Sequence, residues 1–515
     1  MGKHSLLFWR VSIAIFMCKL LLAYMVPLTG DEAYFAIWGQ NPALGYYDHP
    51  PMIGWILYLL EQINSSVFFI RLPAVIFSSL IGVIIYVFLQ RNNQEKAAWI
   101  GLFYAVSPLN IFNVIITTDT PLMLFSFLSA IFLYFGVTKE RYGFYAAAGI
   151  FLGLAFLSKY FAGLLGIAFA IYFLVSEKSK SKTIGASIMF ISIVPFVAFN
   201  LYWNYLNLYP NIMFNMVNRS VGKEEFSIMK GVGFLAMQLL FITPPIAYYA
   251  LKTPRPLLIA KIKTIWRDFP LFFCSWIVPL LIFALISCKK VVGIHWLLSF
   301  YPFMYIFISN AVSLDKLKRS TKFMTAFSFS IVLIIVAIVS LIFVRPQILQ
   351  ENRHYSSIIL ATHTAEIAAD LYPDNKDFSF AATSYVNASI LQYTLGDPVI
   401  VFGKGSHHAR QDDIYTDFRK LSGKNIAILV SSAPDQNAYT LFFDRVEIEK
   451  TAIKSADFWI IKGYDFKYEN YQKSVLTAIK EKYYNLPQFL PLHKGGDTFL
   501  DRYGNIQTNL TEEQR

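Results

Sequence analysis

The residues best suited to chemistry lie near the start of the chain, in a stretch without Lys or Arg. Residues 29–55 read TGDEAYFAIWGQNPALGYYDHPPMIGW, in a chain of formal net charge +12. A carboxylate beside lipid and aromatic rings is partly desolvated, which raises its pKa and makes it a better proton acceptor. We therefore expect Asp31, with Glu32 beside it, to be a catalytic general base. The alternative is that Asp31 caps a helix and Glu32 favours its positive end.

A rigid corner follows at Tyr46-Tyr47-Asp48-His49-Pro50-Pro51. A residue before proline is pushed to extended geometry, so the chain is stiff here. An acid, an imidazole and two phenols favour binding of a phosphate, a metal or a sugar, and a plain turn is the alternative. Asp48 and His49 supply only half of a metal site. We assign Tyr46 and Tyr47 to sugar or acceptor binding.

Polar residues at later positions extend this set. Asp119 lies two residues before Pro121 in NVIITTDTPLMLF, where helix capping is the alternative to a catalytic role. Trp203 and Asn204 open the segment WNYLNLYPNIMFNMVNRSVGKEEF, which pairs aromatic faces with amides as carbohydrate-binding surfaces do. Interfacial aromatic belting is the alternative there. The basic side chains of that segment, Arg219 and Lys223, add attraction for an anion.

Three lysines complete the candidates. Lys159 lies between two apolar runs, and Lys289 and Lys290 precede Gly293-Ile294-His295-Trp296. If these positions face outward, the ammonium groups break the usual preference for basic residues on the cytoplasmic side. Binding of an anionic lipid headgroup explains such local exceptions. His295 is a further candidate for sugar or acceptor binding.

The elements that position these residues are membrane-spanning helices. The 515 residues are 56% hydrophobic, with a mean hydropathy of +0.46. Apolar runs of about 20 residues mark such helices. We predict about eleven spans, the first uncleaved, in residues 1–344: 6–28, 67–90, 97–115, 121–137, 144–157, 161–175, 184–203, 231–251, 269–287, 294–310 and 323–344.

Charge supports this topology. With the N-terminus inside, short inner loops hold most Lys and Arg, while the loops at 29–66 and 116–120 hold none. The apolar stretch 144–175 is too long for one span and has basic residues on both flanks. Two short helices that meet at Ser158-Lys159-Tyr160 satisfy both observations.

The last third of the chain differs in composition. Residues 345–515 contain nineteen basic and twenty-one acidic residues, and the three cysteines lie elsewhere. Short apolar strands such as NIAILVSS alternate with helical patterns such as ATHTAEIAADLY, which predicts an α/β domain. An odd number of spans places this domain on the outer side of the membrane, which is the periplasmic side if the membrane is a bacterial inner membrane. The chain has no zinc-binding Cys/His spacing, phosphate-binding Gly-rich loop or dinucleotide fingerprint, and no nucleic-acid partner is expected.

In residues 1–345 the sequence resembles the GT-C glycosyltransferases of the protein-mannosyltransferase and aminoarabinose-transferase type. The resemblance rests on seven segments in order: GDEAYFAIWGQ, GYYDHPPMIGW, TTDTPLMLF, GLAFLSKYFAGLL, FNLYWNYLNL, LFITPPIAYY and CKKVVGIHWLLSFYPF. It implies an inverting transfer of a monosaccharide from a polyprenyl (undecaprenyl) phosphate donor, with a divalent metal as an additional candidate ligand. Lipid A or lipopolysaccharide is the first acceptor it suggests, in the bacterial inner membrane.

The resemblance also implies roles for individual residues. Asp31 takes the proton from the acceptor, and Asp119 is the family's second acid. Lys159, Lys289 and Lys290 hold the donor phosphate, whose charge grows as the glycosidic bond breaks. His49 stands where the aminoarabinose branch has a lysine, so we assign it to the same phosphate. A protein O-glycosyltransferase of the same superfamily is the alternative, and a lipid or sugar transporter is the alternative from another class.

Overall fold

The computed structural model describes residues 2–217, 225–242, 244–352, 354–371, 377–487, 489–493 and 497–504. Arg219 and Lys223 lie outside these residues. The chain forms two units. Unit 1 comprises residues 1–26, 62–199 and 222–337, and unit 2 comprises residues 27–61, 200–221 and 338–515. Unit 2 thus groups two segments from the first half of the chain with the C-terminal residues. The domain boundary at 344/345 stays a prediction.

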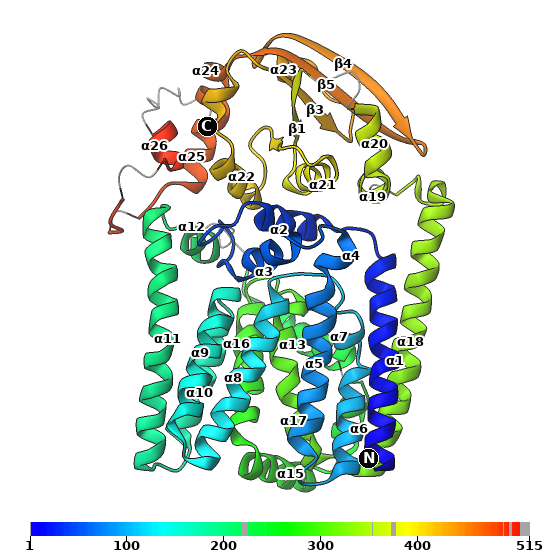
Figure 1. Cartoon of the computed structure of the whole chain (residues 1–515), viewed down its shortest axis with the longest axis vertical. Coiled ribbons are helices and arrows are strands. Elements are labelled where there is room, and N and C mark those ends of the chain that lie inside the picture. The colour runs from blue at the N-terminus through cyan, green and yellow to red at the C-terminus, as the bar shows by residue number, and fades with distance from the viewer. Residues whose placement is uncertain are drawn as a thin grey trace. The chain divides into compact units, whose positions relative to one another are not determined.

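Unit 1 is helical. Figure 1 shows its long helices lying side by side. Its elements are α1 (Lys3–Met25), α4 (Val67–Ile70), α5 (Leu72–Leu89), α6 (Gln94–Ala105), α7 (Pro108–Ile111), α8 (Asp119–Lys139), α9 (Tyr142–Ser158), α10 (Ala162–Val175), most of α11 (Lys180–Leu206), α13 (Ile228–Ile242), α14 (Pro244–Lys252), α15 (Arg255–Asp268), α16 (Pro270–Ser287), the 3-10 helix η3 (Ile294–Phe300), α17 (Tyr301–Ala311) and most of α18 (Leu314–Val344).

Six helices among the described residues are long and apolar enough to cross a membrane: α1, the α4–α5 pair, α8, α11, α16 and α18. The chain is therefore a multi-pass membrane protein. Besides the α4–α5 pair, two predicted spans, 97–115 and 294–310, are not single helices, and proline lies at each interruption. Pro108 opens α7 after α6 has ended, and Pro302 follows the switch from η3 to α17. Proline lacks the N–H that would continue a helix, so it favours a new first turn.

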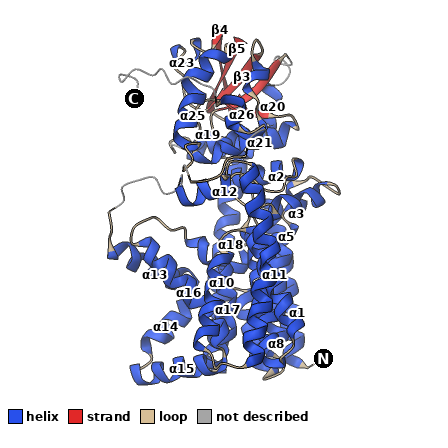
Figure 2. Cartoon of the chain, turned by 90° about the vertical axis from the view of Figure 1, so that its left-hand side faces the viewer, coloured by secondary structure: helices blue, strands red, loops and turns tan. Residues whose placement is uncertain are grey.

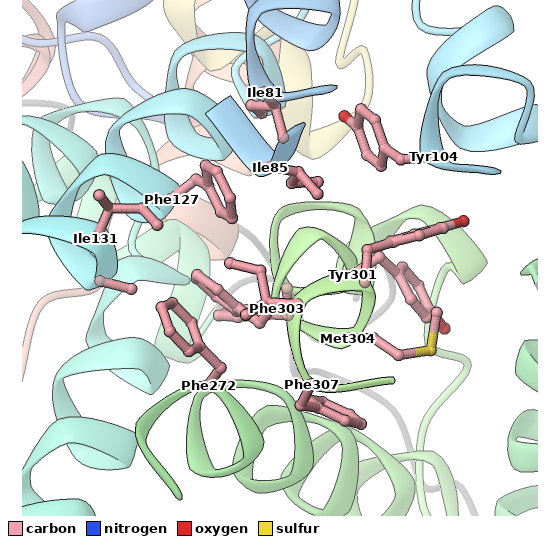
Figure 3. Close-up of a cluster of buried hydrophobic side chains, with 14 of the residues drawn as sticks. Ile81, Ile85, Tyr104, Phe127, Ile131, Phe272, Tyr301, Phe303, Met304 and Phe307 are labelled. Carbon is pink, nitrogen blue, oxygen red and sulfur yellow. The ribbon is translucent and has the colours of Figure 1, made fainter. Parts of the chain in front are cut away.

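Aromatic side chains dominate the core of unit 1. Figure 3 shows Phe127 of α8, Phe272 of α16 and Phe303 of α17 near one another, with Ile81 and Ile85 of α5 close by. All five are buried. Their rings and branched side chains interlock, which holds the helices that carry the polar site residues.

Unit 2 contains the sheet. It begins with α2 (Gly30–Gln40) and α3 (Met52–Glu61), and continues with α12 (Pro210–Ile212) and the π-helix η1 (Met213–Val217). The C-terminal residues form η4 (Pro346–Leu349), α19 (Tyr355–Thr362), α20 (Thr364–Leu371), β1 (Phe378–Ala382), α21 (Tyr385–Leu395), β2 (Val399–Val401), η5 (His407–Ala409), α22 (Arg410–Tyr415), η6 (Phe418–Leu421), β3 (Asn425–Val430), α23 (Asn437–Thr440), β4 (Phe443–Ile453), β5 (Ala456–Phe466), α24 (Tyr468–Tyr471), η7 (Gln472–Leu476), α25 (Thr477–Tyr483) and α26 (Phe499–Tyr503).

The five strands lie in the order β2-β1-β3-β5-β4, with parallel pairing from β2 to β3 and antiparallel pairing beyond. Figure 2 shows the sheet with helices around it. Alternate residues of β3 enter two different cores: Ile426 and Ile428 pack with η7 and α25, and Ala427 and Leu429 pack with α19 and α21. Burial of both faces explains the continuous apolar run NIAILV.

Candidate active site

The first turn of α2 separates the two neighbouring acids. Thr29 is the N-cap, and its backbone N–H and hydroxyl both donate to Glu32 Oε2 at 3.1 Å. The backbone N–H of Glu32 donates back to Thr29 Oγ1, which completes a capping box. The alternative that Asp31 caps this helix is wrong, because Thr29 and the buried Glu32 form the cap. Asp31 was expected to be partly desolvated, but its side chain is exposed.

The carboxylate of Asp31 is held by a residue far along the chain. Tyr385, at the start of α21, donates its hydroxyl to Asp31 Oδ1 at 3.1 Å. Helices α2 and α21 pack closely, as Figure 1 shows. At Gly30 a side-chain methyl would clash with Val386 of α21, so glycine permits this approach. Burial and the nearby Asp31 raise the pKa of Tyr385, so its phenol keeps its proton for this bond.

Asp48 lies in a second polar cluster of unit 2. Its side chain is 3% exposed, and its Oδ2 lies 2.8 Å from His408 Nδ1. Tyr34 of α2 donates its hydroxyl to Asp48 Oδ1 at 2.9 Å. Burial raises the pKa of Asp48, although the bonds from His408 and Tyr34 oppose that shift.

The loop that carries His408 is fixed by buried polar groups. The Arg410 side chain is 1% exposed, pairs with Asp413 at 2.9 Å and donates to the backbone oxygen of Lys404 at 2.8 Å. Its guanidinium also lies 4.8 Å from the ring centroid of Tyr483. Gln411 accepts the backbone N–H of Tyr47 at 2.6 Å, which ties this loop to the corner at residues 46–51.

The four residues of unit 2 assigned to sugar binding are buried, which contradicts a surface role for them. Tyr46 stacks on Trp38 with ring centroids 4.2 Å apart and donates to the Trp38 carbonyl. Trp203 packs against the backbone of Gly45. Tyr47 is 2% exposed and Asn204 is fully buried among Asn200 and Asn211. The aromatic and amide residues of these segments therefore join the two loops to each other.

Asp119 and Lys159 form an ion pair in unit 1. Asp119 lies in the first turn of α8, and Lys159 follows α9 at the break before α10. The predicted pair of short helices around Lys159 is thus present. Lys159 Nζ lies 2.7 Å from Asp119 Oδ2, with side-chain exposures of 9% and 7%. Asp119 Oδ1 is also buried, and no described residue hydrogen-bonds to it. The Asp119 carboxylate therefore pairs with Lys159 and does not cap α8, whose N-cap is Thr118.

The segment that contains His295 lies near this pair. Lys159 Nζ lies 4.8 Å from the ring centroid of Phe161, whose ring is 5.1 Å from that of Trp296 in η3. Helix η3 also packs against α8. His295 is exposed, and so is Lys289 in the turn after α16, where Lys290 is partly buried. Unit 1 thus places the Lys159 and His295 segments in one region.

The predicted metal does not fit the residues present. Both oxygens of Asp48 accept hydrogen bonds from protein groups, and the imidazole that reaches Asp48 belongs to His408. Among the described residues, no three His, Cys, Asp or Glu side chains are grouped to hold a metal ion. The ring of His49 instead lies 6.3 Å from that of Phe35 and 6.4 Å from that of Phe214. We derive no step through a metal.

Sequence reasoning missed Tyr385 and His408, because their partners lie more than 350 residues away. The signal for His408 was present: GSHHAR contains two of the eight histidines side by side, after a short strand. Tyr385 had no comparable signal. The predicted convergence of Asp31, Asp48, Asp119, Lys159 and Lys289–Lys290 on one headgroup involves both units and stays a prediction.

Two comparisons with known proteins bear on the class of this protein. Residues 48–203 match the family model for dolichyl-phosphate-mannose-protein mannosyltransferase. Lipid A galacturonosyltransferase RgtD of Rhizobium johnstonii is 27% identical over 229 residues, which are 43% of this chain and 47% of that protein. The match therefore spans about half the length of that curated relative.

The matches and the apolar helices make this chain similar to the GT-C superfamily of membrane glycosyltransferases. Within that class it is similar to the lipid A transferases. Both findings confirm the resemblance inferred from the sequence and support glycosyltransferase activity.

Proposed function

We propose that this protein transfers one monosaccharide from a polyprenyl phosphate donor to an envelope acceptor, with inversion at the transferred carbon. Lipid A is the first acceptor to test, because the relative RgtD is named for lipid A. The family model that matches residues 48–203 is named for a protein acceptor, which makes protein O-glycosylation the second candidate. We further propose the bacterial inner membrane, with the active site and residues 345–515 in the periplasm.

The proposal rests on the different environments of the neighbouring acids Asp31 and Glu32. Glu32 is buried in the capping box, whereas Asp31 is exposed and its Oδ1 accepts a hydrogen bond from Tyr385. A carboxylate with a fixed direction and an accessible oxygen suits a general base. We propose that Asp31 takes the proton of the acceptor hydroxyl or phosphate as the sugar carbon forms its new bond and polyprenyl phosphate leaves.

The cations of unit 1 suit the other half of the reaction. We propose that Lys159, Lys289 and Lys290 stabilise the negative charge that grows on the leaving phosphate, and that His49 assists them. Asp119 holds Lys159 by the 2.7 Å ion pair and so acts as a positioning residue for this lysine. Its second oxygen, which has no hydrogen-bond partner among the described residues, suits an acceptor group.

The test is transfer of a single sugar from a polyprenyl-phosphate donor by the full chain in detergent. We expect Asp31→Asn to lose turnover by about 10²- to 10⁴-fold, as for loss of a general base, while donor lipid still binds. Glu32→Gln should lower thermal stability more than the rate, since it weakens the cap. Asp435→Asn is the control, because Asp435 is exposed and, among the described residues, its carboxylate accepts only the N–H of Asn437.

Two results would contradict the proposal. One is a wild-type rate in Asp31→Asn, which would refute the base. The other is wild-type protein that moves intact lipid across a vesicle bilayer without breaking a glycosidic bond, which would indicate a transporter. Mass spectrometry of envelope lipids and proteins with and without this protein then identifies the acceptor.

A further inference from the structure

Asp48 and His408 form a dyad that directs one nitrogen of the imidazole outward. Because the buried carboxylate of Asp48 accepts from Nδ1 at 2.8 Å, the Nδ1–H tautomer is favoured and Nε2 becomes an acceptor. The His408 side chain is 33% exposed, and no described residue hydrogen-bonds to its Nε2. The backbone oxygen of His408 accepts the Tyr34 hydroxyl at 3.2 Å, which fixes the loop beneath the ring.

Aromatic rings lie beside the ring of His408. The ring of Tyr385 lies 5.2 Å from that of His408, and the ring of His407 lies 4.3 Å from it. Tyr385 is also the residue that holds Asp31, so one phenol contacts both the exposed carboxylate and the imidazole. Ring faces beside hydrogen-bond acceptors suit a sugar, whose C–H faces pack on the rings while its hydroxyls donate.

The charges around the dyad restrict which sugar fits. Among the described residues, neither Asp31 nor Asp48 has a Lys or Arg ion-pair partner. The nearby Arg410 pairs with Asp413 instead. A sugar that carries a carboxylate would meet like charge here at short range.

We propose that Asp31, Tyr385 and His408 form a subsite for the sugar ring, in which His408 Nε2 accepts a sugar hydroxyl, and that this subsite takes uncharged or amino sugars in preference to uronic acids. This inference makes the proposed function more specific, and the role of the subsite in transfer rests on that proposed function. The proposal gives the C-terminal residues a role in sugar recognition, because the residues first assigned to it are buried: Tyr46, Tyr47, Trp203 and Asn204.

Kinetics of the full chain in detergent test the subsite. We expect His408→Phe to raise KM for the sugar-bearing substrate about two- to twelvefold, the effect of one neutral hydrogen bond, with a smaller change in kcat. His408→Gln should retain part of the binding, because its amide offers an acceptor at similar reach. His354→Gln, at an exposed histidine before α19, is the control. Donors that carry galactose or glucosamine should be used at least tenfold better than one that carries galacturonic acid.

Saturation-transfer NMR with methyl galactoside separates this inference from the proposed function. A signal in wild type that is lost in His408→Phe supports the subsite even if no transfer is observed, in which case only the proposed function fails. The subsite is overturned if wild type gives no signal, or if the KM of His408→Phe for the sugar-bearing substrate equals that of wild type. It is also overturned if the galacturonate donor is used as well as the galactose and glucosamine donors. If His408→Phe and His408→Gln lower kcat to the same extent and lower the melting temperature to the same extent, His408 has a structural role. That result would also overturn the subsite.

Discussion

Neutralising Lys159 tests the buried ion pair of unit 1. At 2.7 Å from Asp119, the pair has an attraction of about 6 kcal/mol at an effective dielectric of 20, much of it offset by desolvation. Lys159→Met leaves the Asp119 carboxylate buried without its cation, which typically costs about 3–5 kcal/mol. At about 2 °C per kcal/mol for a unit of this size, we expect the melting temperature to fall by about 6–10 °C.

A second substitution separates stability from function. Because Asp119→Asn removes the stranded charge, the double variant Lys159→Met/Asp119→Asn should melt within about 2 °C of wild type. It should still lose transfer by about 10²-fold or more, since a cation proposed for the leaving phosphate is gone. Lys139→Met is a matched control: Lys139 also lies 4.8 Å from an aromatic ring centroid, that of Phe135, but it is exposed and has no carboxylate partner among the described residues.

Thermal unfolding by circular dichroism and sugar transfer measure the two effects in the same preparations. A Lys159→Met variant that melts with wild type would show that the pair does not hold the ends of α8 and α9. A double variant no more stable than the single one would assign the loss to packing rather than charge. Near-wild-type transfer by a stable double variant would refute the role of these charges in catalysis.

Three further changes test unit 2 by thermal unfolding. Burial raises the pKa of Glu61 to about 7 from 4.5. Folding therefore opposes its ionisation, and the stability of the fold falls as pH rises between these values. Glu61→Gln should melt at a higher temperature than wild type at pH 8 and at the same temperature at pH 4, and equal melting at both pH values would contradict this. Asp413→Asn leaves Arg410 buried without its carboxylate, at a cost of about 3–5 kcal/mol, and a wild-type melt would show that the pair is dispensable. Gly45→Ala places a methyl against the Trp203 indole, which should cost about 1–3 kcal/mol unless the ring moves aside without loss.

Local sequence patterns were sufficient to predict the structure of segments whose own residues determine it. The break at Lys159 followed from the length of the apolar run and the charge on its flanks, and α9 and α10 flank it. The sheet was visible in its apolar strands, with β4 as the exception. That strand, FDRVEIEKTAI, alternates charged and apolar residues because it lies at the sheet edge, so it lacks the continuous run of the buried β3.

Patterns failed where the partner lies far along the chain. Hydropathy treats residues 97–115 and 294–310 as spans, since an apolar run looks the same with or without an interrupting proline. Aromatic and amide residues at 46–47 and 203–204 look the same whether they face a sugar or one another. Their burial depends on the packing of two loops in unit 2, and that packing depends on residues such as Gln411 and Asn211.

The roles of the two acids at the start of α2 depend on one pattern that the sequence does contain. Thr29-Gly30-Asp31-Glu32 has the spacing of a capping box, in which the fourth residue returns to the first. Neighbouring residues on a helix point about 100° apart. Once Glu32 is committed to Thr29, Asp31 must therefore point elsewhere, and α21 meets it there with Tyr385. Loss of the cap by Thr29→Ala should thus impair transfer through the direction of Asp31, even though Thr29 itself has no part in the chemistry.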